Sequence, residues 1–546
     1  MRSMVSDCVK THKECSCSIS GESIDDNSGV RLPTRLIEVG SFRQPKLRLI
    51  ETNGAHGRYT TLSHCWGPKE HQPIRTLRSN LPNFRHGIPP GLFSLSKTFE
   101  HAVQITREIG LEHIWIDSLC IIQDDPDDWE RESVLMCDIY QNSYFNIVAA
   151  HARDSREGCF YDRQQLNQPR TVKVPYIGHD GRPSGSFLVR SKTPTSLGAE
   201  DPWNTATRKR AWILQEELLA RRLVHYTKAG MYWMCRKFEV LETGETSPYH
   251  WRKLDWTSIA CDYSARLLAY QKDKLRALSG VADAIGRLRP DDHYLVGLWQ
   301  DSLPEQLMWY GISRLDHIQE ISLPSWTWAS RTGKIGFLSM GKFAKECRTL
   351  RVEDSKTVVA EAPILPLVSV LQPSELRGRR AGLVSSEFAG YIGYILPSPL
   401  DKHSEGDAEW RSEVKVDIIF DYLGSLLAQQ TGQHFGWNDT ERVFALTDMN
   451  NMLVGYCTLD NVAHVQQPQE FFYCLPIIKG DKSDLLEVEG RRWYFDFALV
   501  LQTITGKRES ALLKSMDGVS FVRVGIAIVI TYGWTEIFGP RKVRIV

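Results

Sequence analysis

The sequence predicts an α/β protein whose N-terminal half forms an open, mostly parallel sheet with flanking helices, followed by a β-rich C-terminal domain. Two observations carry this prediction. From Arg58 onwards, short β-prone runs alternate with amphipathic helical segments, which is the pattern of parallel α/β layers. Beyond about residue 330, strand-like runs follow one another with few helical segments between them, as in a β-rich domain.

The first elements of the α/β half follow from local patterns. Tyr59 to Ser63 is predicted to be a strand. Ser96 is expected to cap a helix whose apolar residues keep helical spacing up to Gly110, where a left-handed C-cap is expected. His113 to Leu119 is predicted to be a central strand, with Asp117 inside it.

The later elements of this half complete the predicted alternation. The acidic turn Asp124–Asp128 precedes a helix whose pairs Leu135/Ile139 and Met136/Tyr140 predict one buried face. Asn146 to Ala150 is predicted to start a strand, and residues 160–200 lack periodicity and are expected to form a long excursion. Arg210–Arg222 is predicted to be a helix, followed by a β-hairpin over Leu223–Cys235.

Farther along the chain, Tyr270 to Ile285 is predicted to be helical and strand-like runs then dominate. Those runs are Val358–Ala360, Val414–Phe420, Phe444–Leu446, Phe471–Ile478, Trp493–Leu501 and Phe521–Thr531. A chain of 546 residues exceeds what one hydrophobic core usually organises. We expect a lead-in segment at 1–32, an α/β domain at 33–250, a helical connecting region at 251–330 and the β-rich domain at 331–546.

Charge and composition exclude several classes of protein. Lys plus Arg and Asp plus Glu both number 66, so no field of one sign favours nucleic acid or an anionic membrane. The longest apolar stretches, such as Val524 to Thr531, are too short to span a bilayer, and the N-terminus lacks a signal-peptide core. Twelve scattered cysteines do not resemble a disulfide scaffold. We therefore expect a cytoplasmic protein with no nucleic-acid partner and no membrane span.

Cys8, His12, Cys15 and Cys17 form a cluster of soft metal ligands near the N-terminus. Their spacing matches no standard zinc finger, and no second pair of ligands follows at a normal distance. We therefore expect a loosely ordered lead-in and no bound metal.

Two polar clusters lie at or just beyond predicted strand ends, where open α/β sheets bind ligands. One is Ser63-His64-Cys65-Trp66-Gly67, although Ser63 can equally cap the turn while Trp66 packs in the core. The other runs from Asp117 through Cys120 to Gln123. A buried Asp in a strand needs a partner, whether for a site or for bonds to the backbone. A thiol nucleophile with His64 as base is disfavoured, because neighbours on a strand alternate faces.

A third polar cluster lies on the predicted helix from Arg210. Glu217 precedes Arg221 by four residues, the favourable order for a surface ion pair, so a structural role is predicted for Glu217. Glu216 shares a face with Trp212 and Ala220, and apolar surroundings raise the pKa of a carboxyl group for acid/base or cation-stabilising work. A plain buried structural carboxylate is the alternative for Glu216.

Read together, the three clusters resemble the heterokaryon-incompatibility (HET) domain of filamentous fungi. The matching blocks are Tyr59-Thr-Thr-Leu-Ser-His-Cys-Trp-Gly67, Ile114-Trp-Ile-Asp-Ser-Leu-Cys-Ile-Ile-Gln123 and Arg210-Ala-Trp-Ile-Leu-Gln-Glu216. The resemblance extends over roughly residues 33 to 240. Ile122 is a departure, since the family more often has Asn there, and a polar contact from that position is not expected.

The resemblance implies a role in fungal non-self recognition and programmed cell death, with cell-death partner proteins and self-association. It also implies a TIR-like or Rossmann-like sheet, because HET domains are distantly similar to TIR domains, some of which cleave NAD with a glutamate. On that reading Glu216 and Asp117 are catalytic, NAD is the substrate and no cofactor is bound. The residues that would contact the nucleotide are Ser63, Trp66, Cys120, Gln123 and Gln215.

Two other functions stay open from the sequence. One is an accessory protein of fungal secondary metabolism. The other is an interaction module, in which Ser63, Asp117 and Glu216 form only a buried polar network that holds the sheet to its helices.

Overall fold

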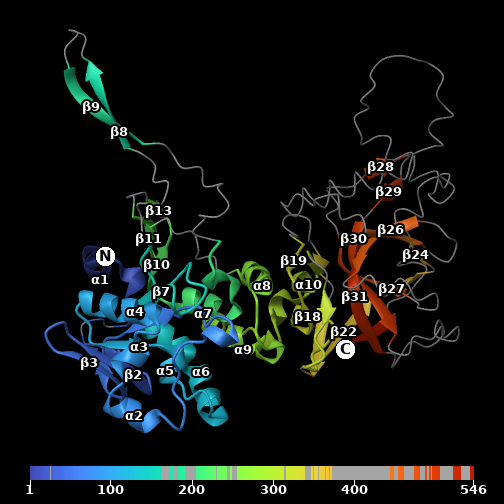
Figure 1. Cartoon of the computed structure of the whole chain (residues 1–546). Coiled ribbons are helices and arrows are strands. Elements are labelled where there is room, and N and C mark those ends of the chain that lie inside the picture. Colours follow the sequence, from blue (N-terminus) through green and yellow to red (C-terminus); the bar gives the residue numbers. More distant parts are fainter. Residues whose placement is uncertain are drawn as a thin grey trace. The chain divides into compact units, whose positions relative to one another are not determined.

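Figure 1 shows the computed structural model of the chain. It describes residues 1–161 except 25 and 27, 204–242 except 229, and 255–338 except 313 and 314. Elsewhere it describes separate strands with a few adjoining residues, between 171 and 190, at 246–248 and between 346 and 546. The chain divides into two compact units, Met1–Asp255 with Arg266–Pro290, and Trp256–Ala265 with Asp291–Val546.

The first unit is built on a nine-stranded sheet. Its strands, in order across the sheet, are β13 (Thr246–Pro248), β12 (Phe238–Leu241), β11 (Gly230–Cys235), β10 (Arg222–Thr227), β7 (Phe145–Val148), β5 (Thr60–Ser63), β6 (His113–Trp115), β2 (Arg35–Gly40) and β3 (Pro45–Glu51).

The sheet is mixed, so the expectation of a mostly parallel sheet is wrong. Only the four central strands, β10, β7, β5 and β6, pair in parallel. Strands β2 and β3 on one side and β11 to β13 on the other pair antiparallel. Short loops join β2 to β3 and β10 through β13, and a short loop can connect only antiparallel neighbours.

Helices provide the crossovers between the parallel strands. Helix α4 (Lys97–Glu108) precedes β6, α6 (Pro126–Asn142) joins β6 to β7, and α7 (Ala211–Leu219) precedes β10. Helix α4 is the helix predicted after Ser96, and it contacts β2 and β6. Gly110 has the expected left-handed backbone, with φ of 82°. Ser96 occupies the N-cap position, but its side chain makes no capping hydrogen bond.

Helix α6 begins as its acidic turn predicts. The Asp125 side chain accepts hydrogen bonds from the backbone N–H groups of Asp127 and Asp128, and so caps the helix. Met136, Ile139 and Tyr140 are buried on its inner face, as expected. Leu135 is instead exposed, so the buried face is narrower than the predicted pairs imply.

Two predicted elements have different bounds in the structure, and two predicted irregular segments contain regular elements. The strand expected to reach Leu119 ends at Trp115, and Asp117 starts the short helix α5 (Asp117–Cys120). The helix expected to reach Arg222 ends at Leu219, because Arg222 begins β10 and pairs with β11. The lead-in is not loosely ordered, since residues 2–11 form helix α1 (Arg2–Thr11). Within the excursion at 160–200, β8 (Thr171–Ile177) and β9 (Pro183–Arg190) form an antiparallel hairpin.

The second unit contains an eleven-stranded sheet, in agreement with the predicted β-rich region. Five predicted runs coincide with strands β22 (Thr357–Ala362), β25 (Val443–Thr447), β27 (Phe472–Lys479), β30 (Phe495–Thr503) and β31 (Ser520–Ile530). The sixth run, Val414–Phe420, lies outside the described residues. Of the helices described, none has the length and apolar character needed to cross a membrane.

Candidate functional site

The order of the parallel strands creates a place for a ligand. The chain passes from β5 to β6 on one side, and then returns across β5 to β7 on the other side. Such a reversal leaves a crevice at the carboxyl ends of the strands, where open α/β sheets bind ligands. The structure has a cleft of about 1460 Å³ that Asp117 and Glu216 both line, and Ser63 ends β5. The fold therefore brings the three predicted polar clusters together.

Glu216 lies at the centre of a buried polar chain behind this cleft. Ser63 Oγ donates a hydrogen bond to Glu216 Oε2 at 2.5 Å, and Asn146 Nδ2 donates to Ser63 Oγ at 3.0 Å. Burial, with a smaller contribution from the nearby Asp117 charge, raises the pKa of Glu216 to about 7, although hydrogen bonds from Ser63 and Tyr140 oppose this rise. Glu216 therefore changes charge near neutral pH, as general acids and bases do.

Asp117 is another carboxyl group of the cleft lining, and its surroundings shift its pKa in the direction opposite to that of Glu216. His64 Nε2 lies 2.9 Å from Oδ1, Trp66 Nε1 donates to Oδ2 at 2.8 Å, and the Ser118 N–H donates to Oδ1 at 2.7 Å. Burial alone would raise the pKa of Asp117, but the His64 ring, Arg210 and Trp66 outweigh burial and hold that pKa below its usual range. Asp117 is thus a fixed carboxylate beside a carboxyl group that titrates.

Arg210 joins the two carboxyl groups electrostatically. It lines the cleft at the start of α7, and its Nη1 donates to the His64 carbonyl at 2.5 Å. Its charge lowers the pKa of both Asp117 and Glu216. Further cations in the cleft lining are Arg75, Arg153, Lys209, Lys228, Lys272 and Arg276, and further carboxylates are Asp124, Asp125, Glu130 and Asp273. The Arg and Lys side chains among these can bind phosphate or carboxylate groups of a ligand.

Aromatic side chains form another part of the cleft wall. Trp129 and Trp212 meet edge to face, with ring centroids 6.4 Å apart. The Arg276 guanidinium lies over the Trp129 ring at 5.0 Å. Aromatic faces of this kind can stack on a planar base or ring.

Of the residues predicted to contact the nucleotide, two line the cleft and three are buried away from its surface. Trp66 and Gln123 line the cleft, and Gln123 Nε2 donates to the Asp117 carbonyl at 3.1 Å. Ser63 is fully buried and reaches the cleft only through Glu216. Cys120 and Gln215 are buried and do not belong to the cleft lining. Helical periodicity accounts for Gln215, because it precedes Glu216 by one residue and points elsewhere.

The thiols near the site are not activated nucleophiles. Burial raises the pKa of Cys65 to about 11 and that of Cys120 to about 12. A thiol reacts as the thiolate, which these environments disfavour at neutral pH.

The predicted ion pair between Glu217 and Arg221 does not form. Glu217 is buried and pairs with Arg266 at 3.4 Å and with Arg208 at 3.6 Å. Arg221 lies beyond the end of α7, where it is fully buried and pairs with Asp26 at 2.9 Å. The surface pairing rule fails here because the helix has no exposed face at these positions.

Sequence reasoning missed two polar partners of the site, Tyr140 and Asn146. Tyr140 was expected to pack on the apolar face of α6, yet its hydroxyl donates to the Leu62 carbonyl at 3.3 Å and also lowers the pKa of Glu216. Asn146 lies in the middle of an otherwise apolar strand, and an amide at such a position needs a partner. That signal could have singled out Asn146.

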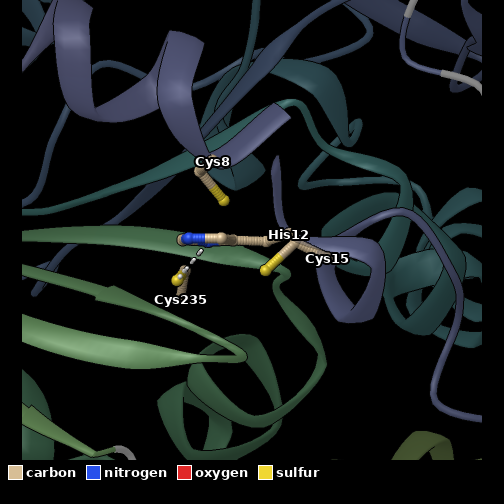
Figure 2. A group of neighbouring side chains, drawn as sticks. All are labelled: Cys8, His12, Cys15 and Cys235. Carbon is tan, nitrogen blue, oxygen red and sulfur yellow. Dashed lines mark hydrogen bonds between the residues drawn. The ribbon is translucent and has the colours of Figure 1, made fainter. Parts of the chain in front are cut away.

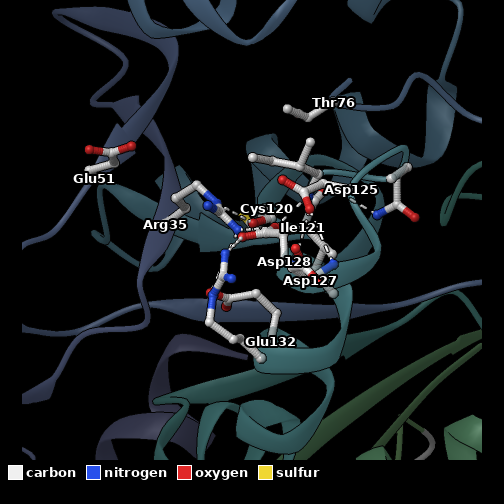
Figure 3. A network of polar contacts seen from close by, with 12 residues as sticks. Arg35, Glu51, Thr76, Cys120, Ile121, Asp125, Asp127, Asp128 and Glu132 are labelled. Atoms are coloured by element: carbon white, nitrogen blue, oxygen red, sulfur yellow. Dashed lines mark hydrogen bonds and ion pairs between the residues drawn. The ribbon is translucent and has the colours of Figure 1, made fainter. Parts of the chain in front are cut away.

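A buried ion network holds the Asp117 segment in place, as Figure 3 shows. Arg35 Nη2 pairs with Asp128 Oδ2 at 2.5 Å, and its Nε donates to the Cys120 carbonyl at 2.7 Å. The Ile122 N–H donates to the same Asp128 oxygen at 2.9 Å. The network thus ties α5 and the loop after it to the start of α6.

The fold and the site define a mixed α/β domain with a polar cleft at the carboxyl ends of its parallel strands. Residues 59–216 match the family model described as "Heterokaryon incompatibility protein (HET)". The chain therefore contains a HET domain over these residues, the domain that is described for heterokaryon incompatibility proteins. The match begins just before β5 and ends at Glu216. No curated protein and no solved structure matches the chain.

Proposed function

We propose that this chain acts in fungal non-self recognition, and that its HET domain triggers programmed cell death after association with a partner protein or with another copy of the chain. The HET match over residues 59–216 supports this role. We also propose a cytoplasmic location, which fits the free state of the cysteines that the structure describes.

We further propose that the domain acts by cleaving NAD or a related nucleotide in the cleft. The observation that carries this proposal is that Asp117 and Glu216 both line one cleft, beside the cation Arg210. The two carboxyl groups have opposite pKa shifts, and such divergence is typical of paired catalytic carboxyl groups. The neighbouring cations suit the diphosphate of NAD, and the tryptophans suit its rings.

In the proposed reaction, water hydrolyses the bond between nicotinamide and ribose. Nicotinamide leaves with the bonding electron pair, and positive charge develops at the ribose C1′. Ionised Glu216 stabilises that charge, held in position by Ser63 and Tyr140. Water oxygen bonds to C1′ and releases a proton. Asp117 accepts three hydrogen bonds, out of about four that a carboxylate can accept, so it can receive one more from a ribose hydroxyl.

The test incubates the full-length protein with NAD and measures free nicotinamide by chromatography. We expect turnover in the wild type and a loss of about 100-fold or more in Glu216→Gln, the scale of removing one transition-state contact. Glu217→Gln is the matched control on the same helix, and its folding is checked by circular dichroism. Turnover should rise with pH as Glu216 ionises, reach half of its plateau near pH 7 and level off about one pH unit higher. No turnover in monomeric or associated protein would remove the enzymatic proposal.

The cell-death role is tested separately, by expressing the full-length chain in a filamentous fungus. Growth arrest by the wild type and not by Glu216→Gln would indicate that cell death depends on the cleavage proposed for the cleft. Equal arrest by both would support cell death without catalysis. Normal growth at high expression, also in the presence of an incompatible partner strain, would contradict the role.

A further inference from the structure

Four buried side chains outside the cleft point toward one another, as Figure 2 shows: Cys8, His12, Cys15 and Cys235. One ligand atom from each lies within 4.8 Å of all the others. The three cysteines are at most 1% exposed and His12 is 7% exposed. The feature is therefore a closed cluster of three thiols and one imidazole.

Local geometry explains how three of the four residues meet. Cys8 lies in α1 and His12 is its C-cap residue, so spacing of four places both side chains on one face of the helix. Cys15 ends the following 3₁₀ turn, Lys13–Cys15. Cys235 comes from the end of β11, where it pairs with Arg222 of β10. The cluster thus joins the N-terminal segment to the central sheet.

The donor set and its dimensions suit zinc. Zn²⁺ prefers thiolate and imidazole ligands in a tetrahedron, with Zn–S of about 2.3 Å and Zn–N of about 2.0–2.1 Å. These bond lengths require a sulfur and a nitrogen ligand to lie about 3.6 Å apart. His12 Nδ1 lies 3.5 Å from Cys235 Sγ. The other pairs of donor atoms all lie within 4.8 Å of one another.

Charges and donors around the cluster also favour a metal–thiolate centre. Zn²⁺ with three thiolates and a neutral imidazole carries a net charge of −1. Two fully buried cations, Arg221 and Arg222, share the carboxylate of Asp26, which leaves this trio with one excess positive charge. Arg222 Nε donates to Cys8 Sγ at 3.3 Å, as second-layer donors commonly do at metal-bound sulfur. A metal–thiolate centre with a charge of −1 would therefore balance the excess positive charge of Arg221, Arg222 and Asp26, whereas neutral thiols would not.

We propose that Cys8, His12, Cys15 and Cys235 bind one Zn²⁺ that holds the N-terminal segment on the sheet. Four protein ligands leave no open position, so the site is structural and not catalytic. This proposal is independent of the function proposed for the cleft. The earlier expectation of no metal counted only residues 8 to 17, whereas folding brings the fourth ligand from Cys235.

Cys17 provides a matched control within the same segment. Its Sγ donates to the Glu14 carbonyl at 3.5 Å, it is only partly buried, and it is not a member of the cluster. Cys17→Ser should therefore leave metal binding intact, whereas Cys235→Ser should abolish it.

The primary test measures metal in the wild-type, full-length protein, purified without chelator or histidine tag. We expect about one zinc per chain by mass spectrometry of the metal. Growth with Co²⁺ should give the visible absorption of tetrahedral cobalt with a thiolate charge-transfer band. Zinc well below stoichiometry together with no cobalt spectrum would overturn the proposal. A disulfide among the three cysteines, found by alkylation and mass spectrometry, would also overturn it.

The variants assign the ligands. Cys235→Ser and His12→Ala should lose zinc, and Cys17→Ser should retain it. Where a ligand variant does not fold, titration of the wild type with a mercurial reagent replaces it, and zinc release should follow modification of the buried thiols. Equal zinc loss in Cys17→Ser and Cys235→Ser, or full zinc retention in Cys235→Ser, would contradict the assignment.

Discussion

Glu216 is buried, yet it faces a cleft and carries a pKa near neutrality. Water would solvate the ionised carboxylate better than the protein does, and burial is the largest cause of the raised pKa of about 7. The hydrogen bonds from Ser63 and Tyr140 only partly offset this cost. If this side chain served stability alone, an uncharged residue would cost the folded state less. An ionisable group at this position therefore points to function.

The raised pKa of Glu216 predicts how Glu216→Gln changes stability with pH. The folded pKa of about 7 lies above the ordinary 4.5, so the folded state holds the proton more tightly than the unfolded state. The wild type therefore loses stability as pH rises from the lower value to the higher, by up to about 3 kcal/mol at 1.36 kcal/mol per unit. Glutamine avoids this loss. Urea unfolding should show Glu216→Gln to be more stable than the wild type at about pH 8 and similar at about pH 4.5.

If Glu216→Gln is less stable than the wild type at both pH values, the carboxylate belongs to a structural polar network whose removal leaves Ser63 and Asn146 unsatisfied.

At the scale of elements, the Arg35 network connects strand β2 to the segment that carries Asp117. Arg35 contacts the end of α5 through the Cys120 carbonyl and the start of α6 through Asp128 (Figure 3). Both members of the pair are nearly inaccessible, with side chains 6% and 2% exposed. The position of the loop between α5 and α6 thus depends on the buried guanidinium of Arg35.

We predict that Arg35→Met destabilises the protein by about 3–5 kcal/mol, because it leaves Asp128 as a buried charge without its buried partner. Arg131→Met is the matched control, since Arg131 pairs with the same Asp128 at 3.0 Å but is 64% exposed. That variant should cost less than about 1 kcal/mol. Chemical unfolding measures the loss in the free energy of unfolding for both variants. Equal losses in the two variants would show that burial of the pair is not what matters.

At the scale of the molecule, the chain forms two compact units, each with its own buried core. The first buries the nine-stranded sheet, and the second buries five tryptophans that are at most 1% exposed. Those tryptophans are Trp256, Trp299, Trp309, Trp326 and Trp328. Chains with separate cores commonly unfold in more than one step.

We therefore expect calorimetry of the full-length protein to show two unfolding transitions. Arg35→Met should lower the temperature of one transition and leave the other unchanged, because the Arg35 network lies wholly in the first unit. A single transition that shifts as a whole would show that the two units unfold together.

Much of the central fold could be predicted from local patterns. Strand β5, helices α4 and α6 and the β10–β11 hairpin follow from apolar periodicity, capping residues and turn residues, which act between near neighbours. The directions of the outer strands were not predicted, because strand pairing depends on contacts between distant segments. The ion partners of Glu217 and Arg221 were missed for the same reason.

By itself, the sequence determined the α/β character, the HET blocks and the choice of Glu216 and Asp117, because each rests on residue type and short spacing. Only the tertiary structure decided that these two residues face one cleft while Cys120 and Gln215 do not, and that Cys235 meets Cys8, His12 and Cys15. The physical reason is that a shared cavity or ligand set depends on distances through space, which the pairing of strands far apart in the chain establishes.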